Sequence, residues 1–200
     1  MKKQRLWLLF LLIFLALAGT LVLRAQDRSA LRPPKGAKIA LVVFQDLECP
    51  DCARAHPLIE EAARTYKIPV VQHDFPLPYH QWSLEAAVMA RYFDSKSAKL
   101  GDQFRTEVFA HQPEITKENL RAFADKFAAA HKVTLPVFVD PEGKFAAAIE
   151  ADKALGQRIG ITHTPTLYVV SNRRGGTPFV EVVDRSKLYQ QIDEMKRATD

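Results

Sequence analysis

The two cysteines are the residues of this chain whose type and spacing could do chemistry. Cys49 and Cys52 are the only cysteines among 200 residues, and only Pro50 and Asp51 separate them. Such a dithiol can form and break a disulfide, or it can supply two thiolate ligands to a metal ion. A purely structural disulfide is disfavoured, because a loop this short restricts the unfolded chain very little. Redox chemistry is therefore the leading interpretation.

The sequence on either side predicts where the pair sits in the fold. The apolar, branched residues 39–44 predict a buried strand, and a helical pattern follows from Ala53 to Tyr66. The cysteines then lie in the first turn of a helix, where unpaired N–H groups and the helix dipole stabilise a thiolate. We expect Cys49 to be the more exposed, attacking thiol and Cys52, one turn deeper, to be the resolving thiol.

Metal binding remains the alternative, and it depends on histidine. His56 follows Cys52 in the same predicted helix and would add a third ligand, with His73 or His80 as a fourth. A structural zinc site more often contains a second cysteine pair. A non-enzymatic metal-binding module using Cys49, Cys52 and His56 thus stays open. The redox interpretation needs no cofactor and no metal, because the dithiol is itself the redox group.

The first 25 residues predict export. A basic start precedes 18 almost wholly apolar residues, 6–23, and Arg24 and Ala25 follow them. This pattern is typical of a signal peptide or a signal anchor, and the run is just long enough to span a bilayer. We expect the domain in the periplasm or at the cell exterior, tethered to the cytoplasmic membrane by residues 6–23, or secreted if cleaved near Ala25. Disulfides form and persist there.

Charge and composition exclude nucleic acid as the obvious partner. The formal net charge is +5, but residues 1–25 contribute four of those positive charges. The remainder is close to neutral, so the basic isoelectric point belongs to the targeting segment. With 48% hydrophobic and 26% charged residues, the chain has the composition of a globular domain with a proper core.

The rest of the chain predicts one α/β domain. Residues 26–37 are polar and rich in proline, which indicates a linker, and 38–198 form the domain. A second strand at 69–75 completes a βαβ unit with parallel strands, and helices fill an insertion at about 80–158. Expected caps for these and the last helix are Ser83, Ser97, Thr116 and Ser186, and residues 135–144 are either a short strand or an irregular link. Strands at 166–170 and 179–183 predict a hairpin.

Three motifs in this order resemble the DsbA/BdbD-like branch of the thioredoxin superfamily. They are Phe44-x-Asp46-x-x-Cys49-Pro50-x-Cys52, Phe75-Pro76-Leu77-x-Tyr79-His80 and Gly160-Ile161-x-x-Thr164-Pro165-Thr166. The resemblance covers about residues 38–198. It implies a thioredoxin-like fold with a central mixed sheet and a helical insertion. It also implies a protein thiol–disulfide oxidoreductase, and an oxidase is expected before a dedicated reductase or isomerase.

The resemblance also implies how partners bind. A cis bond between Thr164 and Pro165 would pack against Cys49 and Cys52, and the backbone of Thr164 would pair with an extended substrate chain. The expected partners are substrate proteins with thiols or disulfides, and a membrane or soluble redox protein that resets the dithiol.

Two positions depart from the pattern of familiar members. Thioredoxin and DsbA carry a buried acid six residues before the first cysteine, where this chain has Val43. Asp46, Glu48 or a water molecule could substitute for this acid, or the two carboxylates are plain surface acids. DsbA has histidine where this chain has Asp51, and a carboxylate there should disfavour a nearby thiolate. We therefore expect the pKa of Cys49 to lie above that of DsbA and the pair to be less oxidising.

Overall fold

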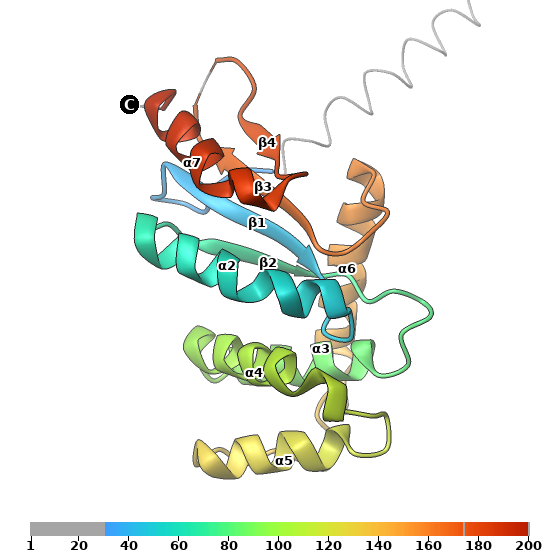
Figure 1. Ribbon diagram of the computed structural model, residues 1–200. Coiled ribbons are helices and arrows are strands. Elements are labelled where there is room, and N and C mark those ends of the chain that lie inside the picture. The colour runs from blue at the N-terminus through green and yellow to red at the C-terminus, as the bar shows by residue number, and fades with distance from the viewer. Residues whose placement is uncertain (1–30, 174, 200) are drawn as a thin grey trace, which may run out of the picture.

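A computed structural model describes residues 31–173 and 175–199 of the chain. A mixed sheet of four strands, in the order β2-β1-β3-β4, forms the centre of the described part (Figure 1). β2 runs parallel to β1, whereas β3 is antiparallel to β1 and β4 is antiparallel to β3. The mixed sheet and the hairpin agree with the sequence prediction. The strands are β1 Ile39–Gln45, β2 Val70–Asp74, β3 Thr166–Ser171 and β4 Phe179–Glu181.

β1 is the central strand, and its sequence explains why. All seven of its residues are buried, which suits a continuous apolar run flanked by strands and covered on both faces. Helix α2, Pro50–Tyr66, follows β1 and returns the chain to β2. The predicted βαβ unit is therefore present, with Leu41 opposite Val70 in the parallel register.

Helices cover both faces of the sheet. α2 and α7, Leu188–Arg197, lie on one face, and α6, Lys144–Ile159, lies on the other (Figure 1). Alternate residues of β1 feed the two cores, so Leu41 and Val43 pack on the α2 and α7 side while Phe44 packs on the α6 side. This two-sided burial fixes the end of β1, from which the cysteine pair follows.

Three further helices stack beside α2, away from the sheet (Figure 1). They are α3 Ser83–Asp94, α4 Ala98–His111 and α5 Leu120–Ala130. Their aromatic core, which includes Phe93, Phe104 and Phe127, continues without interruption to Cys49 and Cys52. The helical layer thus forms one wall of the cysteine site.

Several predicted helix starts are wrong. Ser97 caps α4 as expected, accepting from the amide of Leu100 at 3.1 Å. Ser83, however, is the first residue of α3 and follows its cap residue Trp82, and α5 begins at Leu120 rather than after Thr116. Before α7 the chain forms a short 3-10 helix, η3 Arg185–Lys187, whose cap is Asp184. Another 3-10 helix, η2 Gln112–Glu114, follows α4. Residues 135–143 are an irregular link without a strand.

A buried ion network joins the helical layer to the sheet. Arg105 on α4 is 2% exposed and pairs with Asp94 at 2.7 Å, while Arg91 on α3 pairs with Asp74 and Asp152. The Asp152 side chain also accepts from the backbone amide of Asp74. Strand β2, α3, α4 and α6 are therefore held at one junction.

The predicted membrane segment, residues 6–23, falls outside the described residues, as do residues 26–30 of the predicted linker. Within 31–173 and 175–199, no helix has the length and apolar character needed to cross a bilayer.

Candidate active site

Cys49 is the N-cap residue of α2, and the helix begins at Pro50. Its backbone is still extended there, with φ −80° and ψ 118°, so the sulfur sits at the positive end of the helix dipole. Both cysteines are free thiols, and Cys49 is 6% exposed while Cys52 is 2% exposed. Cys49 is therefore more enclosed than the sequence predicted, because the loop containing Thr164 lies against its sulfur.

The protein shifts the pKa values of the two thiols in opposite directions. A hydrogen bond from the Cys52 thiol is the largest of the effects that lower the pKa of Cys49 to about 5, against the opposing effect of burial. The Thr164 side chain and the N–H groups of Cys52 and Asp51 add to this lowering. Burial, followed by the hydrogen bond to Cys49 and its charge, raises the pKa of Cys52. The site thus holds one thiolate backed by one protonated thiol.

The loop before β3 closes over this pair. The bond between Thr164 and Pro165 is cis, as the family resemblance implies. The carbonyl oxygen of Thr164 lies 3.3 Å from Cys49 Sγ. Thr164 Oγ1 is buried and has no conventional hydrogen-bond partner among the described residues, and its side chain lowers the pKa of both thiols. Thr166 Oγ1 donates to the carbonyl of His163 at 2.7 Å and fixes the loop from behind.

Asp51 does not face the thiolate as an unpaired charge. Its carboxylate accepts from Arg185 at 2.8 Å and from Arg54 at 3.1 Å. Arg185 is the main cause that holds the pKa of Asp51 below its ordinary value. From the sequence, the Asp51 carboxylate was expected to oppose the thiolate. The structure shows a paired carboxylate instead, because η3 brings Arg185 to it.

Asp46 is a buried anchor and not a surface acid. It is 1% exposed, and its carboxylate accepts from the amides of Glu48 and Leu77, the ring of His80 at 2.7 Å and the hydroxyl of Ser83. Both oxygens are thus already occupied, so Asp46 orders the loop before Cys49 and is poorly placed to act as a base. Its backbone amide donates to Cys52 Sγ at 3.4 Å.

Glu48 and His80 link the same loop to the helical layer. The Glu48 carboxylate accepts from the amides of Trp82 and Ser83 at 2.7 and 3.0 Å and so caps α3. The bond of the His80 ring to Asp46 ties the segment before α3 to the loop before Cys49.

Gln112 is a site residue that the sequence analysis missed. Its side-chain nitrogen donates to the carbonyls of Leu47 and Cys49, at 2.7 and 3.2 Å, and the residue is 9% exposed. Gln112 begins η2, 63 residues from Cys49, and nothing in the local sequence indicates this contact. Arg185 was missed for the same reason.

The predicted metal ligands are not brought together. The His56 ring is hydrogen-bonded to Thr106 Oγ1 at 2.9 Å and packs at a tilt against the Phe109 ring, and burial lowers the pKa of His56 to about 4. His73 is bonded to Asp152, and His80 is bonded to Asp46. In the described part of the chain, no three histidine, cysteine or acidic side chains are arranged to hold a metal ion.

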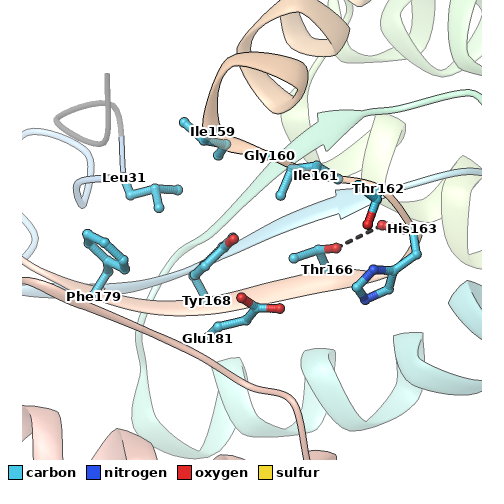
Figure 2. Close-up of a pocket in the computed structure, with 10 residues that line it drawn as sticks. All are labelled: Leu31, Ile159, Gly160, Ile161, Thr162, His163, Thr166, Tyr168, Phe179 and Glu181. Carbon is cyan, nitrogen blue, oxygen red and sulfur yellow. Dashed lines mark hydrogen bonds between the residues drawn. The ribbon is translucent and has the colours of Figure 1, made fainter. Parts of the chain in front are cut away.

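Two cavities adjoin the cis-proline loop, and His163, Thr166 and Glu181 line both. One cavity, of about 150 Å³, is lined by apolar residues that include Ile59 and Pro165, and also by charged residues. The other, of about 230 Å³, lies between Leu31, the end of α6 and the β3–β4 hairpin (Figure 2). Figure 2 shows the Thr166 hydroxyl bonded to the His163 carbonyl at one end of it. The residues that line the first cavity are Asp51, Ala55, Ile59, His163, Pro165, Thr166, Leu167, Glu181, Val182, Val183 and Arg185.

Comparison with known proteins agrees with this geometry. The family model described as thioredoxin matches residues 34–193. The chain belongs to the thioredoxin family. A cysteine pair at the start of a helix, facing a cis-proline loop, is thus found in a thioredoxin-family domain, and the fold predicted from the three motifs is confirmed.

Solved structures show which form of the thioredoxin fold this is. The thiol–disulfide exchange protein α-DsbA2 of Wolbachia pipientis matches with a TM-score of 0.67 and 19% identity, over 89% of this chain and 98% of that one. ScsC of Proteus mirabilis matches with 0.65 and 20%, over 94% and 89%. DsbA2 of Pseudomonas aeruginosa matches with 0.59 and 20%, over 82% and 92%. The fold of this thioredoxin-family protein is therefore DsbA-like.

Two curated relatives match through a small part of their length. The Na⁺/H⁺ antiporter NhaA 3 of Salinispora tropica is 27% identical over 169 residues, which is 81% of this chain and 24% of the antiporter. NhaA 1 of Salinispora arenicola is 28% identical over 167 residues, or 78% and 24%. This chain thus spans about a quarter of each antiporter, and most of the antiporter lies outside the match.

Proposed function

We propose that this thioredoxin-family protein is an extracytoplasmic thiol–disulfide oxidoreductase that introduces disulfides into substrate proteins through Cys49 and Cys52. The observation that carries the proposal is the pairing of the two thiols. Cys49, at the start of α2, has a pKa of about 5, and Cys52 is buried behind it with a raised pKa. A stabilised thiolate favours the reduced form of the pair, so its disulfide is an oxidant.

The exchange follows from these acidities. A substrate thiolate attacks Cys49 Sγ of the disulfide, the bond between the sulfurs breaks, and Cys52 leaves and takes up a proton. A second substrate thiolate then attacks the substrate sulfur of the mixed disulfide, and Cys49 leaves as a thiolate. The substrate has lost two electrons and the dithiol has gained them. The low pKa of Cys49 helps the second step, because a more acidic thiol is the better leaving group.

Thr164 and Pro165 are the proposed substrate-binding residues. An extended substrate chain would pair with the backbone of Thr164, next to Cys49 Sγ, and a neighbouring apolar side chain would enter the 150 Å³ cavity. A separate redox protein must then reoxidise the pair. We further propose that export and tethering through residues 6–23 place the domain where disulfides persist.

A disulfide reductase or isomerase is the second candidate, and the pKa of Cys49 is the observation that favours it. The pKa of Cys49, about 5, lies between the values of about 3.5 for DsbA and about 7 for thioredoxin. The active-site disulfide is therefore expected to be a weaker oxidant than that of DsbA.

Two measurements on the full-length protein test the proposal. Equilibration with glutathione buffers, followed by alkylation and mass measurement, gives the redox potential of the pair. A value near about −120 mV supports the oxidase, and one near about −270 mV supports a reductant. A Cys52→Ala variant should trap mixed disulfides with substrate proteins, whereas Cys49→Ala should trap none. A dithiol that does not titrate with glutathione would refute both redox functions.

A further inference from the structure

Arg185 reaches the active site from the opposite end of the chain. It begins η3, directly after the β3–β4 hairpin, and lies 134 residues from Asp51. Its Nη2 donates to Asp51 Oδ1 at 2.8 Å and its Nη1 donates to the Asp51 carbonyl at 3.3 Å. One guanidinium therefore holds both the side chain and the backbone of Asp51, the residue directly before Cys52.

We propose that Arg185 is a positioning residue for the Cys49 thiolate, which offsets the Asp51 carboxylate and fixes the peptide unit between Asp51 and Cys52. The inference rests on the proposed function in one respect, namely that the dithiol is the reacting group. Arg185 thus makes the segment between the β3–β4 hairpin and α7 a determinant of how strongly the dithiol oxidises.

The carboxylate contact works through charge. A negative group beside a thiol disfavours its thiolate and raises its pKa. Arg185 makes Asp51 half of an ion pair, so the thiolate meets a nearly neutral neighbour. Arg185 and Asp51 are only partly exposed, with side-chain exposures of 37% and 38%, so water screens the pair less than it would screen a fully exposed one.

The carbonyl contact works through the backbone. The Asp51 carbonyl belongs to the same peptide unit as the Cys52 N–H, which is one of the groups that stabilise the charged Cys49 sulfur. A cationic donor on the carbonyl polarises this peptide unit and strengthens its N–H as a donor. It also holds the first turn of α2 in the orientation that directs the N–H at the sulfur.

Other charged groups near Asp51 are weaker candidates for this role. Arg54 also contacts the Asp51 carboxylate, but its side chain is 69% exposed and, among the described residues, it makes no hydrogen bond to the backbone of the cysteine turn. Glu181 and His163 line the same cavity as Asp51 and Arg185. Arg54 is therefore the matched control, because it shares the carboxylate and lacks the carbonyl contact.

The test measures the Cys49 thiolate directly, by its ultraviolet absorbance during a pH titration of the reduced full-length protein. Arg185→Met should reduce the thiolate fraction at pH 5 by about three- to fivefold. It should also increase the oxidised fraction at a fixed glutathione ratio, because the reduced form is less stable. Arg54→Met should cause less than half of the change in thiolate fraction. Arg185→Lys keeps the positive charge and should therefore retain part of the thiolate fraction that Arg185→Met loses.

The double variant Asp51→Asn with Arg185→Met separates the charge effect from simple loss of structure. Removing both charges should return the thiolate fraction towards that of the wild type. An unchanged thiolate fraction in Arg185→Met would overturn the proposal, and so would an equal change in Arg54→Met or a double variant as shifted as Arg185→Met. If Arg185→Met does not fold, Arg185→Lys is titrated in its place, and a smaller loss of thiolate in the same direction is expected. A shifted titration in a protein that exchanges no disulfides would refute the proposed function and leave this inference standing.

Discussion

Cys49 Sγ lies 3.3 Å from the carbonyl oxygen of Thr164, a residue 115 positions further along the chain. This contact joins the first turn of α2 to the cis-proline loop before β3. A sulfur in this position has a helix N-terminus on one side and a backbone edge, suited to an extended peptide, on the other. The reacting atom and the proposed substrate-binding backbone are therefore in contact before any substrate arrives.

The Thr164 hydroxyl offers the first prediction. It is buried without a conventional partner among the described residues and lowers the pKa of both thiols. Thr164→Val keeps the shape and removes the hydroxyl, so the thiolate titration of Cys49 should move to higher pH. Stability should not fall by more than about 1 kcal/mol, because no satisfied hydrogen bond is lost. Thr162→Val, on the exposed part of the same loop, should leave the titration unchanged.

The pH dependence of stability follows from the Cys49 pKa. It is about 5 in the folded protein, against an ordinary value of 9.0. A lowered folded-state pKa adds stability that is complete above the unfolded value and is lost as the pH falls towards 5. The reduced protein should therefore lose about 1.4 kcal/mol relative to the oxidised protein for each pH unit between 8 and 5. The raised pKa of Cys52 acts only above this window.

Urea unfolding of both redox forms at several pH values measures this slope. Cys49→Ser has no titrating thiol at this position, so the difference between its slope and that of the reduced wild type isolates the contribution of Cys49. Parallel pH profiles for the reduced and oxidised wild type would show that the thiolate is not stabilised by folding.

Gln112 should matter to stability although it lies far from the cysteines in sequence. Gln112→Leu leaves the carbonyls of Leu47 and Cys49 without this donor in a buried site, which should lower the free energy of unfolding by about 1–3 kcal/mol. Gln103→Leu, on the exposed side of α4, is the control and should change it by less than about 0.5 kcal/mol. Equal effects of the two substitutions on urea unfolding would contradict the assigned contact.

Asp46 should be a strong determinant of folding. Asp46→Ala removes the acceptor for two amides, a histidine ring and a hydroxyl. We expect a loss of at least about 3 kcal/mol, because several buried donors are left unsatisfied. Thermal and urea unfolding should show this, with exposed Glu142→Ala as the control. A small loss would mean that water readily replaces the carboxylate.

The sequence by itself predicted the main elements of the fold and the position of the cysteine pair. Residues 39–66 predict a strand, a cysteine pair and a helix, and the three motifs predict the thioredoxin fold and the cis bond at Pro165. The strand and the helix follow from periodicity and from helix start signals, which act between near neighbours, whereas the fold and the cis bond follow from the family resemblance. Even so, the caps expected at Ser83, Thr116 and Ser186 were wrong, because tertiary contacts such as Glu48 with α3 decide where a helix begins.

Only the tertiary structure decided the chemistry of the charges. In sequence Asp51 is a carboxylate between two thiols, and Asp46 is either a substitute for the missing buried acid or a plain surface acid. Folding pairs Asp51 with Arg185 and buries Asp46 against His80 and Ser83. The pKa and the reactivity of a group depend on its burial and on the charges within a few ångströms. Those neighbours come from distant parts of the chain, so no local pattern around the cysteines could have revealed them.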